Sequence, residues 1–381
     1  MKKLTKIVMY TPTLIEFGGG EKYILLLAEF LSTLPNINVT LISDNRVITK
    51  SKLKDFSQTG LENIEYELIS GKNELKFITE NADIFICLSN YKKVKSGARH
   101  HIQLLQIPYG KITGSSILRK LIFGEWREAI KDLYRINLLL FSRNEADLII
   151  TNSKFVNDTL QNNYAINSQT LYPPIQDYYV KGIAKKKIIL SVGRFFIGLY
   201  NEKRYDILTQ AFRRAFDTKL NNWEYHIVGN AKNDLKTNFF LSNLKEANKN
   251  YPIYFHVNES YESLKRIYNE AAIFWHGAGY GVDEKLYPEK VEHFGMTTVE
   301  AMSSGCIPVV INKGGQRESV STALDGFLWD SIDELINYSN DIAEKKIQVS
   351  TLRVNARKKY SEFNFDKFQE RALQLISPFF S

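Results

Sequence analysis

The 381-residue sequence contains few of the features that mark a secreted or membrane-spanning protein. It has two cysteines, Cys87 and Cys306, and both lie in apolar surroundings. We interpret them as core residues of a cytosolic protein rather than as a disulfide framework. No apolar run reaches the roughly 18–20 residues that a membrane-spanning helix needs. The basic start, residues 1–9, has a short apolar part and no cleavage site, which favours a first buried strand over a signal peptide.

Short runs of β-branched and aromatic residues alternate with helical patterns along the whole chain. Such alternation predicts parallel sheets with helices on both faces. A chain of this length also exceeds one ordinary core, and the alternation starts again after Tyr172-Pro173-Pro174. We therefore predict an α/β protein of two doubly wound, Rossmann-like domains, residues 1–183 and 184–362. A C-terminal helix, residues 363–381, follows and could pack back toward the first domain.

The elements expected in the two series follow from these patterns. The predicted strands are residues 4–10, 38–43, 83–88, 100–106, 147–151, 187–193, 224–228, 253–256, 272–276 and 307–311. The predicted helices are residues 20–34, 115–141, 153–161, 203–216, 235–248, 260–269, 296–304, 331–345 and 363–377. Ligands of doubly wound domains bind where strands end and helices begin, so the active site is expected in the cleft between the domains.

Acidic residues are absent from residues 84–124, and the chain carries a net charge of +8. The cations of this stretch are Lys92, Lys93, Lys95, Arg99, Lys111, Arg119 and Lys120. The helical pattern that follows has an apolar stripe, with cations beside it: Ile117, Leu118, Leu121, Ile122, Trp126, Ile130 and Leu133, then Arg127, Lys131 and Arg135. A basic amphipathic element is typical of peripheral contact with an anionic membrane. It is equally typical of a solvated rim beside a core-facing helix, and the sequence leaves both interpretations open.

The first segment suited to a ligand is the triple glycine Gly18-Gly19-Gly20, which follows the first predicted strand and opens a helix. Glycines allow close approach of the backbone, and a helix N-terminus presents free amides to an anion. The segment matches neither a dinucleotide fingerprint nor a phosphate loop. We interpret it as a phosphate or sugar contact, with a flexible turn as the alternative.

The second segment is Gly193-Arg194, at the end of the first strand of the second series, followed by Lys203 where a helix begins. A guanidinium fork and an ammonium point charge together suit a diphosphate. Such a pair in an ordinary protein is usually surface charge, so this signal is weak by itself.

The third segment is the most informative and runs from the predicted strand end at His276 to the helix near Thr297. Gly277, Gly279 and Gly281 are interpreted as glycines that let the chain approach a ligand, and a mobile loop is expected up to Glu289. Glu292 precedes a tight turn, and Glu300 falls about one turn into the helix, where it could hold a ribose diol. The alternative is that both glutamates serve capping and solvation.

These residues resemble a known family. The pattern Glu292-His293-Phe294-Gly295, then Glu300-Ala301-Met302 and Gly305, with Gly314-Gly315-Gln316 and Gly326-Phe327 downstream, is similar to retaining glycosyltransferases of GT-B fold. That family includes sucrose synthase, phosphatidylinositol mannosyltransferases and dolichol-linked α-1,2-mannosyltransferases. The resemblance extends to Gly18–Gly20, Thr151-Asn152-Ser153, Tyr172-Pro173-Pro174, Gly193-Arg194 and Lys203.

The resemblance implies a role for each matching residue. Arg194 and Lys203 are expected to bind the donor diphosphate, Glu292 the transferred sugar and Glu300 the ribose, with His276 also on the donor side. Backbone contacts are expected from Phe294, Gly295, Met296 and Thr297, and Gly19 and Gly20 are expected to close over the phosphates. The catalytic residues are then Glu292, Arg194 and Lys203.

One segment departs from the family pattern. Relatives that act on lipid-linked mannose often carry a Tyr-x-His-Tyr-Pro loop in the first domain, and here Gln106 stands where that histidine would be. His101 lies upstream at the start of the predicted strand. Gln106 and His101 are the acceptor-side candidates, and His101 could equally be structural.

The sequence has no Asp-x-Asp motif and no cluster with metal-ligand spacing, so no metal or other cofactor is expected. The resemblance implies front-face attack with retention, in which the departing phosphate accepts the proton of the acceptor and Glu292 orients the sugar. The expected partners are a nucleotide sugar, with GDP-mannose ahead of UDP-sugars, and a glycan or lipid-linked glycan acceptor of polysaccharide biosynthesis. We expect a cytoplasmic enzyme, peripheral at the inner face of the membrane, that binds no nucleic acid; the alternative is a non-enzymatic protein that binds anionic membranes or polyanions.

Overall fold

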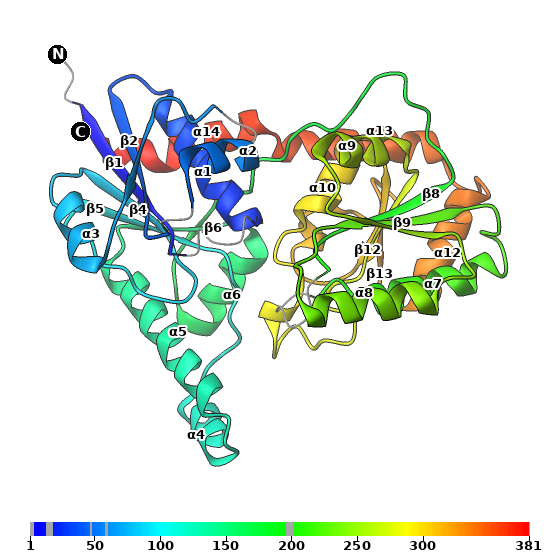
Figure 1. The fold of residues 1–381 in the computed structure, drawn as a ribbon, viewed down its shortest axis with the longest axis horizontal. Coiled ribbons are helices and arrows are strands. Elements are labelled where there is room, and N and C mark those ends of the chain that lie inside the picture. Colours follow the sequence, from blue (N-terminus) through cyan, green and yellow to red (C-terminus); the bar gives the residue numbers. More distant parts are fainter. Residues whose placement is uncertain (1–3, 13–17, 46–47, 58–59, 196–201, 381) are drawn as a thin grey trace. The chain divides into compact units, whose positions relative to one another are not determined.

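The computed structural model describes residues 4–12, 18–45, 48–57, 60–195 and 202–380, and it contains two compact units (Figure 1). Unit 1 is Met1–Pro174 together with Asp366–Ser381, and unit 2 is Ile175–Phe365. The sequence placed the first boundary after residue 183. The segment after Pro174 belongs to unit 2 because it packs there: the amide of Tyr178 donates to Ser303 Oγ at 3.0 Å.

Unit 1 is built on a seven-stranded sheet of order β3-β2-β1-β4-β5-β6-β7, and the pairings in it are parallel. Its strands are β1 Thr5–Tyr10, β2 Ile37–Ser43, β3 Ile64–Leu68, β4 Ile84–Leu88, β5 His100–Leu105, β6 Leu148–Thr151 and β7 Gln169–Thr170. Its helices are α1 Gly19–Ser32, α2 Lys50–Ser57, α3 Lys72–Thr79, α4 Gly114–Ile122, α5 Trp126–Glu145, α6 Lys154–Tyr164 and α14 Phe365–Ile376, followed by the short 3₁₀ helix η3 Ser377–Phe379. The apolar strand β4 is buried along its whole length, as a parallel strand covered on both faces must be.

Unit 2 repeats this plan with a six-stranded sheet of order β10-β9-β8-β11-β12-β13, again with parallel pairings. Its strands are β8 Ile188–Val192, β9 Glu224–Gly229, β10 Ile253–Val257, β11 Ile273–His276, β12 Ile307–Ile311 and β13 Phe327–Trp329. Its helices are α7 Tyr205–Phe216, α8 Leu235–Ala247, α9 Tyr261–Glu270, α10 Met296–Ser303, α11 Gln316–Ser319, α12 Ile332–Ala343 and α13 Val349–Tyr360, with 3₁₀ helices η1 Pro288–Lys290 and η2 Ser361–Phe363. The predicted α/β class with two doubly wound units is confirmed.

The C-terminal helix α14 completes unit 1 from the far end of the sequence. Phe368 packs edge-on against Tyr23 of α1, with ring centroids 5.8 Å apart. The Tyr23 hydroxyl donates to the carbonyl of Leu171 at 3.0 Å. Arg371 also donates to Gln169 Oε1 at 2.9 Å, so the last helix is fixed to the edge of the sheet near β7.

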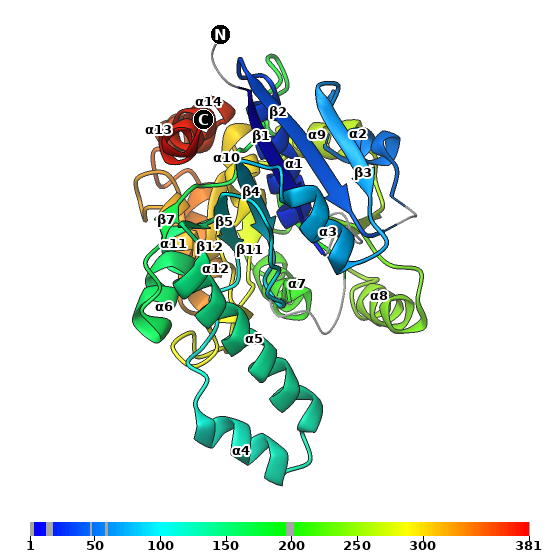
Figure 2. The ribbon, with the colours of Figure 1, turned by 90° about the vertical axis from the view of Figure 1, so that its left-hand side faces the viewer.

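The predicted helix over residues 115–141 is two helices, α4 and α5, because Gly124 has φ +75° and ends the first one. The predicted apolar stripe does not face the core, although α5 buries Ala129, Leu138 and Leu139. Of that stripe, Leu118, Leu121, Ile122, Trp126, Ile130 and Leu133 are exposed. Arg135, which was expected outside the stripe, is instead buried. Figure 2 shows the two helices as a hairpin that extends from the sheet of unit 1.

Both cysteines are buried and unpaired, as predicted, and burial raises the pKa of the Cys87 thiol far above its usual range. None of the described helices is long and apolar enough to cross a bilayer.

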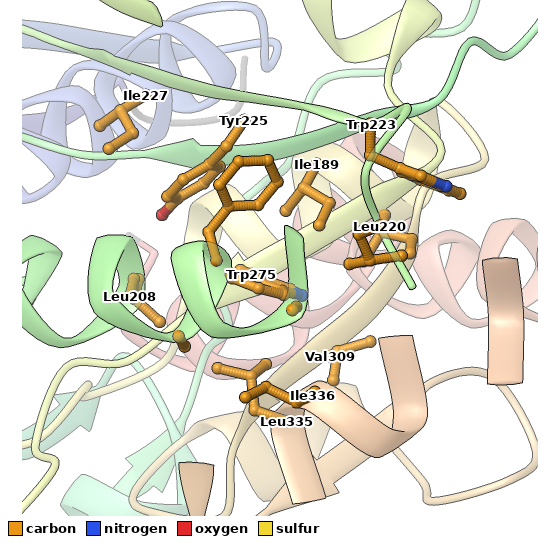
Figure 3. Close-up of a cluster of buried hydrophobic side chains, with 14 of the residues drawn as sticks. Ile189, Leu208, Leu220, Trp223, Tyr225, Ile227, Trp275, Val309, Leu335 and Ile336 are labelled. Atoms are coloured by element: carbon orange, nitrogen blue, oxygen red, sulfur yellow. The ribbon is translucent and has the colours of Figure 1, made fainter. Parts of the chain in front are cut away.

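The core of unit 2 lies between its sheet and the helices α7 and α12. Figure 3 shows Leu208 of α7, Trp275 of β11 and Leu335 of α12 among the side chains of this cluster. The Trp275 indole N–H is buried, and it donates to Ser339 Oγ of α12 at 2.9 Å. This bond gives the largest core side chain one fixed orientation, since a buried polar group requires a partner.

Replacing Leu335 by alanine should lower the free energy of unfolding of unit 2 by about 2–5 kcal/mol, because the side chain is fully buried. Urea unfolding followed by tryptophan fluorescence measures this in a Trp126→Phe background, where the remaining tryptophans, 223, 275 and 329, all belong to unit 2. Leu324, which is 58% exposed, is the matched control and should change stability by less than about 0.5 kcal/mol. Equal losses for the two variants would contradict the core assignment.

Candidate active site

The strand order of unit 2 reverses between β8 and β11, because β9 and β10 lie on one side of β8 and β11 lies on the other. In doubly wound sheets, ligands bind beyond the carboxyl ends of the strands at such a point. β8 leads into Gly193-Arg194, and β11 ends at His276. Two of the segments singled out from the sequence therefore meet at the ligand-binding end of one sheet.

Three predicted site residues contact one another there. Lys203 Nζ lies 2.5 Å from Glu292 Oε2, and His276 Nε2 lies 3.0 Å from the same oxygen. Lys203 Nζ and His276 Nε2 are 3.5 Å apart. All three side chains are largely buried, so solvent screens this cluster weakly. The structure describes no further hydrogen bond to Glu292 Oε1, which leaves that oxygen available to a ligand.

Burial and charge act in opposite directions on Glu292. Burial alone would raise its pKa, but the Lys203 charge and the hydrogen bond from His276 outweigh burial and hold that pKa well below its usual range. Burial and the Lys203 charge lower the pKa of His276. The site therefore contains an ionised glutamate and a neutral histidine. Because Glu292 can only accept, His276 carries its proton on Nε2, and its buried Nδ1 has no partner among the described residues.

Glycines at the ends of β8 and β9 position Lys203. A Cβ on Gly193 would lie 2.9 Å from two carbons of the Lys203 side chain, so the lysine lies directly over this glycine. A Cβ on Gly229 would lie 1.8 Å from the Gly193 carbonyl oxygen, which excludes any side chain there. The Tyr205 hydroxyl donates to the same carbonyl at 2.8 Å. These contacts hold the backbone of Gly193, which directly precedes Arg194, in one position.

Two further glycines fix the backbone of Glu292. A Cβ on Gly314 would lie 2.2 Å from the Glu292 carbonyl oxygen, and a Cβ on Gly315 would lie 2.3 Å from that of His293. The amide of Gly315 also donates to the Glu292 carbonyl at 2.9 Å. The downstream motif Gly314-Gly315 therefore has a structural explanation, since its two glycines let the chain after β12 pack directly on the loop that carries Glu292.

Helix α10 begins beside this loop with Gly295, in the left-handed region at φ +95°, as its N-cap. The amides of Met296 and Thr297 have no hydrogen-bond partner among the described residues, as expected for the first turn of a helix without a side-chain cap. Gln316 lies against Gly295, and neither polar atom of its buried side-chain amide has a partner within the described part of the chain. A buried amide without partners is costly, which makes this helix N-terminus a candidate site for a polar ligand.

Glu300 lies further along α10 and is buried at 9% exposure. Its Oε2 accepts a hydrogen bond from the Tyr268 hydroxyl at 2.8 Å. After burial, the Glu300 charge is the largest influence raising the pKa of Tyr268. The tyrosine thus stays protonated and holds the carboxylate in one orientation. Phe294, by contrast, turns its side chain into the core against Phe363, with ring centroids 5.2 Å apart, so a ligand could meet its backbone alone.

The loop between β11 and Glu292, for which the sequence predicts mobility, makes several contacts within unit 2. Arg204 donates to the Tyr280 carbonyl at 2.5 Å, and Lys313 donates to that of Val282. Glu284 accepts from the Gly314 amide at 2.9 Å and pairs with Arg317 at 2.6 Å. The glycines of this loop also pack against protein.

Of the three loop glycines, two contact side chains of the unit itself. A Cβ on Gly277 would lie 3.2 Å from Leu208, and one on Gly279 would lie 2.8 Å from Val291. Gly279 and Gly281 both have positive φ, at +94° and +79°. Packing against the protein thus explains Gly277 and Gly279, and backbone conformation explains Gly279 and Gly281, without a ligand.

In unit 1 the structure brings Gly20 and Gln106 together. A Cβ on Gly20 would lie 2.6 Å from Gln106 Oε1, so the first turn of α1 packs on this amide. The backbone amide of Gln106 in turn donates to Asn90 Oδ1 at 2.7 Å. Gly18 caps α1, and Gly19 is its first residue. The triple-glycine loop and the acceptor-side candidate therefore belong to one end of the sheet, although Phe17 lies outside the described residues.

His101 lies apart from this group. It is buried within strand β5, and its ring packs against Phe85 and Phe141, with centroids 5.3 and 5.6 Å away. Gln106 lies five positions further along the chain, just after β5 ends, which corresponds to about 16 Å for an extended strand. Burial lowers the pKa of His101, so it is a neutral core histidine in this structure.

Sequence reasoning gave no role to Gln316 or Tyr268, although both contact predicted site residues. Gln316 directly follows Gly314-Gly315. A polar side chain after two glycines is the feature of the sequence that could have indicated its place in the site. Tyr268 lies in α9, 32 residues from Glu300, and nothing in its local sequence indicates the contact.

Comparison with known proteins defines the class first. HepE of Anabaena in complex with UDP superposes with a TM-score of 0.72 at 16% identity, over 98% of this chain and 100% of that chain. TarM gives 0.74 at 10% identity over 98% and 99%, and WaaG, a glycosyltransferase involved in lipopolysaccharide biosynthesis, gives 0.67 at 13% over 97% and 99%. At these identities the likeness shows the fold alone, which is the GT-B fold.

A family model matches most of unit 2. Residues 180–359, a little under half of the chain, match the family model of glycosyl transferases group 1. The GDP-Man:Man(3)GlcNAc(2)-PP-Dol alpha-1,2-mannosyltransferase of Xenopus laevis is 26% identical over 255 residues, 62% of this chain and 49% of that protein. Mannosylfructose-phosphate synthase of Agrobacterium fabrum is 25% identical over 197 residues, 50% of this chain and 40% of that protein. The chain thus spans about half the length of these relatives, or less.

Replacing Lys203 by methionine should destabilise unit 2 by about 3–5 kcal/mol at neutral pH, because it leaves the Glu292 charge buried without its cation. The folded pKa of Glu292 then rises instead of falling, so the loss should shrink as the pH is lowered and the carboxylate is protonated. Urea unfolding in the Trp126→Phe background measures both effects.

The matched control is Arg214→Met, which removes an ion pair of 2.6 Å with Asp333 whose side chains are 52% and 73% exposed. Its loss should be about 1 kcal/mol or less. The buried pair would be contradicted if Lys203→Met lowered the free energy of unfolding only as much as the control does. It would also be contradicted if that loss grew as the pH was lowered.

Gly314→Ala should destabilise unit 2 more than Gly281→Ala. Both residues have positive φ, but a Cβ at position 281 meets nothing closer than Arg204 at 3.8 Å, whereas one at position 314 meets the Glu292 backbone. Strain alone should cost about 1–2 kcal/mol at residue 281. The same unfolding assay separates the two, and equal losses would show that the packing of residue 314 on the Glu292 loop contributes nothing.

Proposed function

We propose that the protein is a retaining glycosyltransferase that moves a hexose from a nucleotide sugar to a glycan or lipid-linked glycan. The observation that carries the proposal is the cluster of Lys203, His276 and Glu292 at the switch point of unit 2. A buried cation, an ionised carboxylate with one open oxygen and a neutral histidine with an open Nδ1 are groups suited to a sugar joined to a diphosphate. The match of residues 180–359 to the model of glycosyl transferases group 1 supports this class of reaction.

Charge on the leaving diphosphate is proposed to be stabilised by protein groups, without a metal ion. Lys203 supplies one cation at the cluster, and Arg194, two residues after β8, supplies a second near the same end of the sheet. The amides of Met296 and Thr297 add the positive end of α10, and such preorganised dipoles lower the barrier as charge develops. Transfer is therefore expected to continue in the presence of a chelator.

Glu292 is proposed to orient the transferred sugar. Lys203 and His276 occupy one of its oxygens, so the other can accept from sugar hydroxyls. Its lowered pKa keeps it ionised, which suits hydrogen-bond acceptance and makes it a poor proton donor. We propose that the acceptor attacks the same face that the diphosphate leaves, and that a departing phosphate oxygen takes the acceptor proton.

The nucleoside end of the donor is assigned to Glu300. Its carboxylate is held by Tyr268, about one turn into the helix whose first amides are proposed to face the diphosphate, so a ribose diol could bind it. In unit 1, Gly19 and Gly20 remain proposed phosphate contacts, and Gln106, which Gly20 packs against, is the proposed acceptor-side residue.

GDP-mannose is the proposed donor. The names of the Xenopus laevis and Dictyostelium discoideum relatives include GDP-Man; these relatives are 26% identical over 255 residues and 30% identical over 140. A UDP-sugar is the second candidate, because HepE, which shares the fold, was crystallised with UDP and with UDP-glucose.

A nucleotide screen combined with Glu292→Gln tests donor and site together. GDP at about 100 times its dissociation constant should stabilise the wild-type protein by roughly 2.7 kcal/mol, seen as a rise in Tm, while UDP should give little shift. Glu292→Gln should keep the GDP shift, since Glu292 is proposed to contact the sugar and not the nucleotide. It should lose at least about 100-fold in GDP-mannose turnover.

A Tm shift with UDP and none with GDP would reassign the base and leave the site intact. Near-normal turnover by Glu292→Gln would overturn the role of the cluster. Donor hydrolysis gives the same test without an acceptor. If the variant releases GDP from GDP-mannose at the wild-type rate, and its melting curve confirms the fold, the role of the cluster is likewise overturned.

A further inference from the structure

The hairpin of α4 and α5, residues 114–145, turns large apolar side chains outward along α4 and the first half of α5. The inward face of α5 buries Asp132 and Arg135, at 2% and 8% exposure, together with Ala129, Leu138 and Leu139. Its outward face contains Trp126, Ile130 and Leu133, at 54%, 42% and 54% exposure. Surface helices normally turn their apolar stripe to the core, so this stripe is available to something outside the chain.

The two inward polar side chains of α5 are held by ion pairs, which fixes the orientation of its first half. Asp132 accepts from Lys120 of α4 at 2.5 Å and from Arg135 of α5 at 2.7 Å. Arg135 also lies over the ring of Tyr109, at 5.2 Å from its centroid. One buried carboxylate thus joins the two helices, and turning either helix to bury its apolar side chains would break these bonds.

Helix α4 and the turn after it extend the same apolar surface. None of the side chains of α4, all of which the structure describes, is buried. Leu118, Leu121, Ile122 and Phe123 are 59%, 50%, 71% and 71% exposed. In both views of the ribbon, α4 lies away from the sheet of its unit, at the tip of the hairpin (Figures 1 and 2).

Cations surround this apolar surface. Arg119 lies over the ring of Phe123 and Arg127 over that of Trp126, at 5.9 and 5.1 Å. Lys93 and Lys95 line a hollow beside Leu140, together with Glu145. Residues 84–124 contain no acidic side chain, and within residues 114–145 six cations outnumber four acidic residues: Arg119, Lys120, Arg127, Lys131, Arg135 and Arg143 against Glu125, Glu128, Asp132 and Glu145. Exposed apolar and aromatic side chains between cations match the interface of an anionic bilayer, where tails take the apolar groups and headgroups take the charges.

We propose that the α4–α5 hairpin is a membrane-docking element that inserts its apolar face, residues 118, 121–123, 126, 130 and 133, into the interface of an anionic lipid bilayer. The inference does not depend on the donor or on the transferase reaction. Charge complementarity favours a lipid surface over a second copy of the chain, because two copies would bring like charges together around the shared apolar patch.

Trp126 provides the measurement. The other three tryptophans, Trp223, Trp275 and Trp329, are 6%, 0% and 0% exposed, so Trp126 dominates any change in solvent contact. Adding vesicles of phosphatidylcholine with about a third phosphatidylglycerol should shift its emission to the blue and pellet the protein with the lipid. Vesicles of phosphatidylcholine alone should bind at least about tenfold more weakly, and salt should weaken binding to the anionic vesicles.

Two pairs of variants locate the contact. Leu121→Ser/Ile122→Ser/Phe123→Ser should lower vesicle binding at least about tenfold, and Arg119→Glu/Arg127→Glu should do the same. The matched controls are Phe77→Ser/Leu235→Ser/Phe239→Ser, whose native side chains are 71%, 91% and 69% exposed, and Lys236→Glu/Lys245→Glu on α8. The controls should bind as the wild-type protein does, and melting curves confirm that every variant folds.

Several results would overturn the proposal. Wild-type protein that fails to bind the anionic vesicles, or that binds neutral vesicles equally well, removes the lipid assignment. Equal losses in the control variants remove the hairpin as the contact. A blue shift of Trp126 that grows with protein concentration in buffer, with a dimer in sedimentation, identifies a second copy as the occupant instead.

Discussion

The buried ion pair between Lys203 and Glu292 is the interaction on which the candidate site depends. Glu292 belongs to neither a helix nor a strand, and its carboxylate is held by Lys203, which precedes α7, and by His276 at the end of β11. Lys203 in turn lies over Gly193. The backbone of Gly193 can pass the end of β9 only because residue 229 there is a glycine. The geometry of one carboxylate therefore rests on glycines far from it in sequence, because each admits a backbone where a side chain would not fit.

Much of the fold could be predicted because the central strands are continuous apolar runs, and β4 and β12 are buried along their whole length. The elements that were missed are short or polar. β3 carries two glutamates, β7 has two residues, and α13 buries Leu352, Ala356 and Tyr360 in an otherwise polar helix. Periodicity cannot distinguish such segments from loops, since little of their surface is buried.

The candidate site was predictable to the extent that position in the sheet predicts position in space. Arg194 and His276 follow neighbouring strands, so their proximity could be inferred from the strand–helix order. The sequence could not show which groups pack against the loop glycines. A glycine indicates that another group comes close to the backbone, but it does not identify that group. The orientation of α5 could not be inferred either. Periodicity identifies an apolar face, but Asp132 and Arg135 turn inward beside Ala129, Leu138 and Leu139, where Asp132 pairs with Lys120 and Arg135.

The return of α14 to unit 1 has a consequence for how the protein is made. Chains are synthesised from the N-terminus, and domains usually fold in that order as they emerge. Here Phe368 closes over Tyr23, so unit 1 lacks its last helix until the residues of α14 have left the ribosome. Unit 2 has all of its residues before that point. The part of the protein whose synthesis starts first is therefore the part that is completed second.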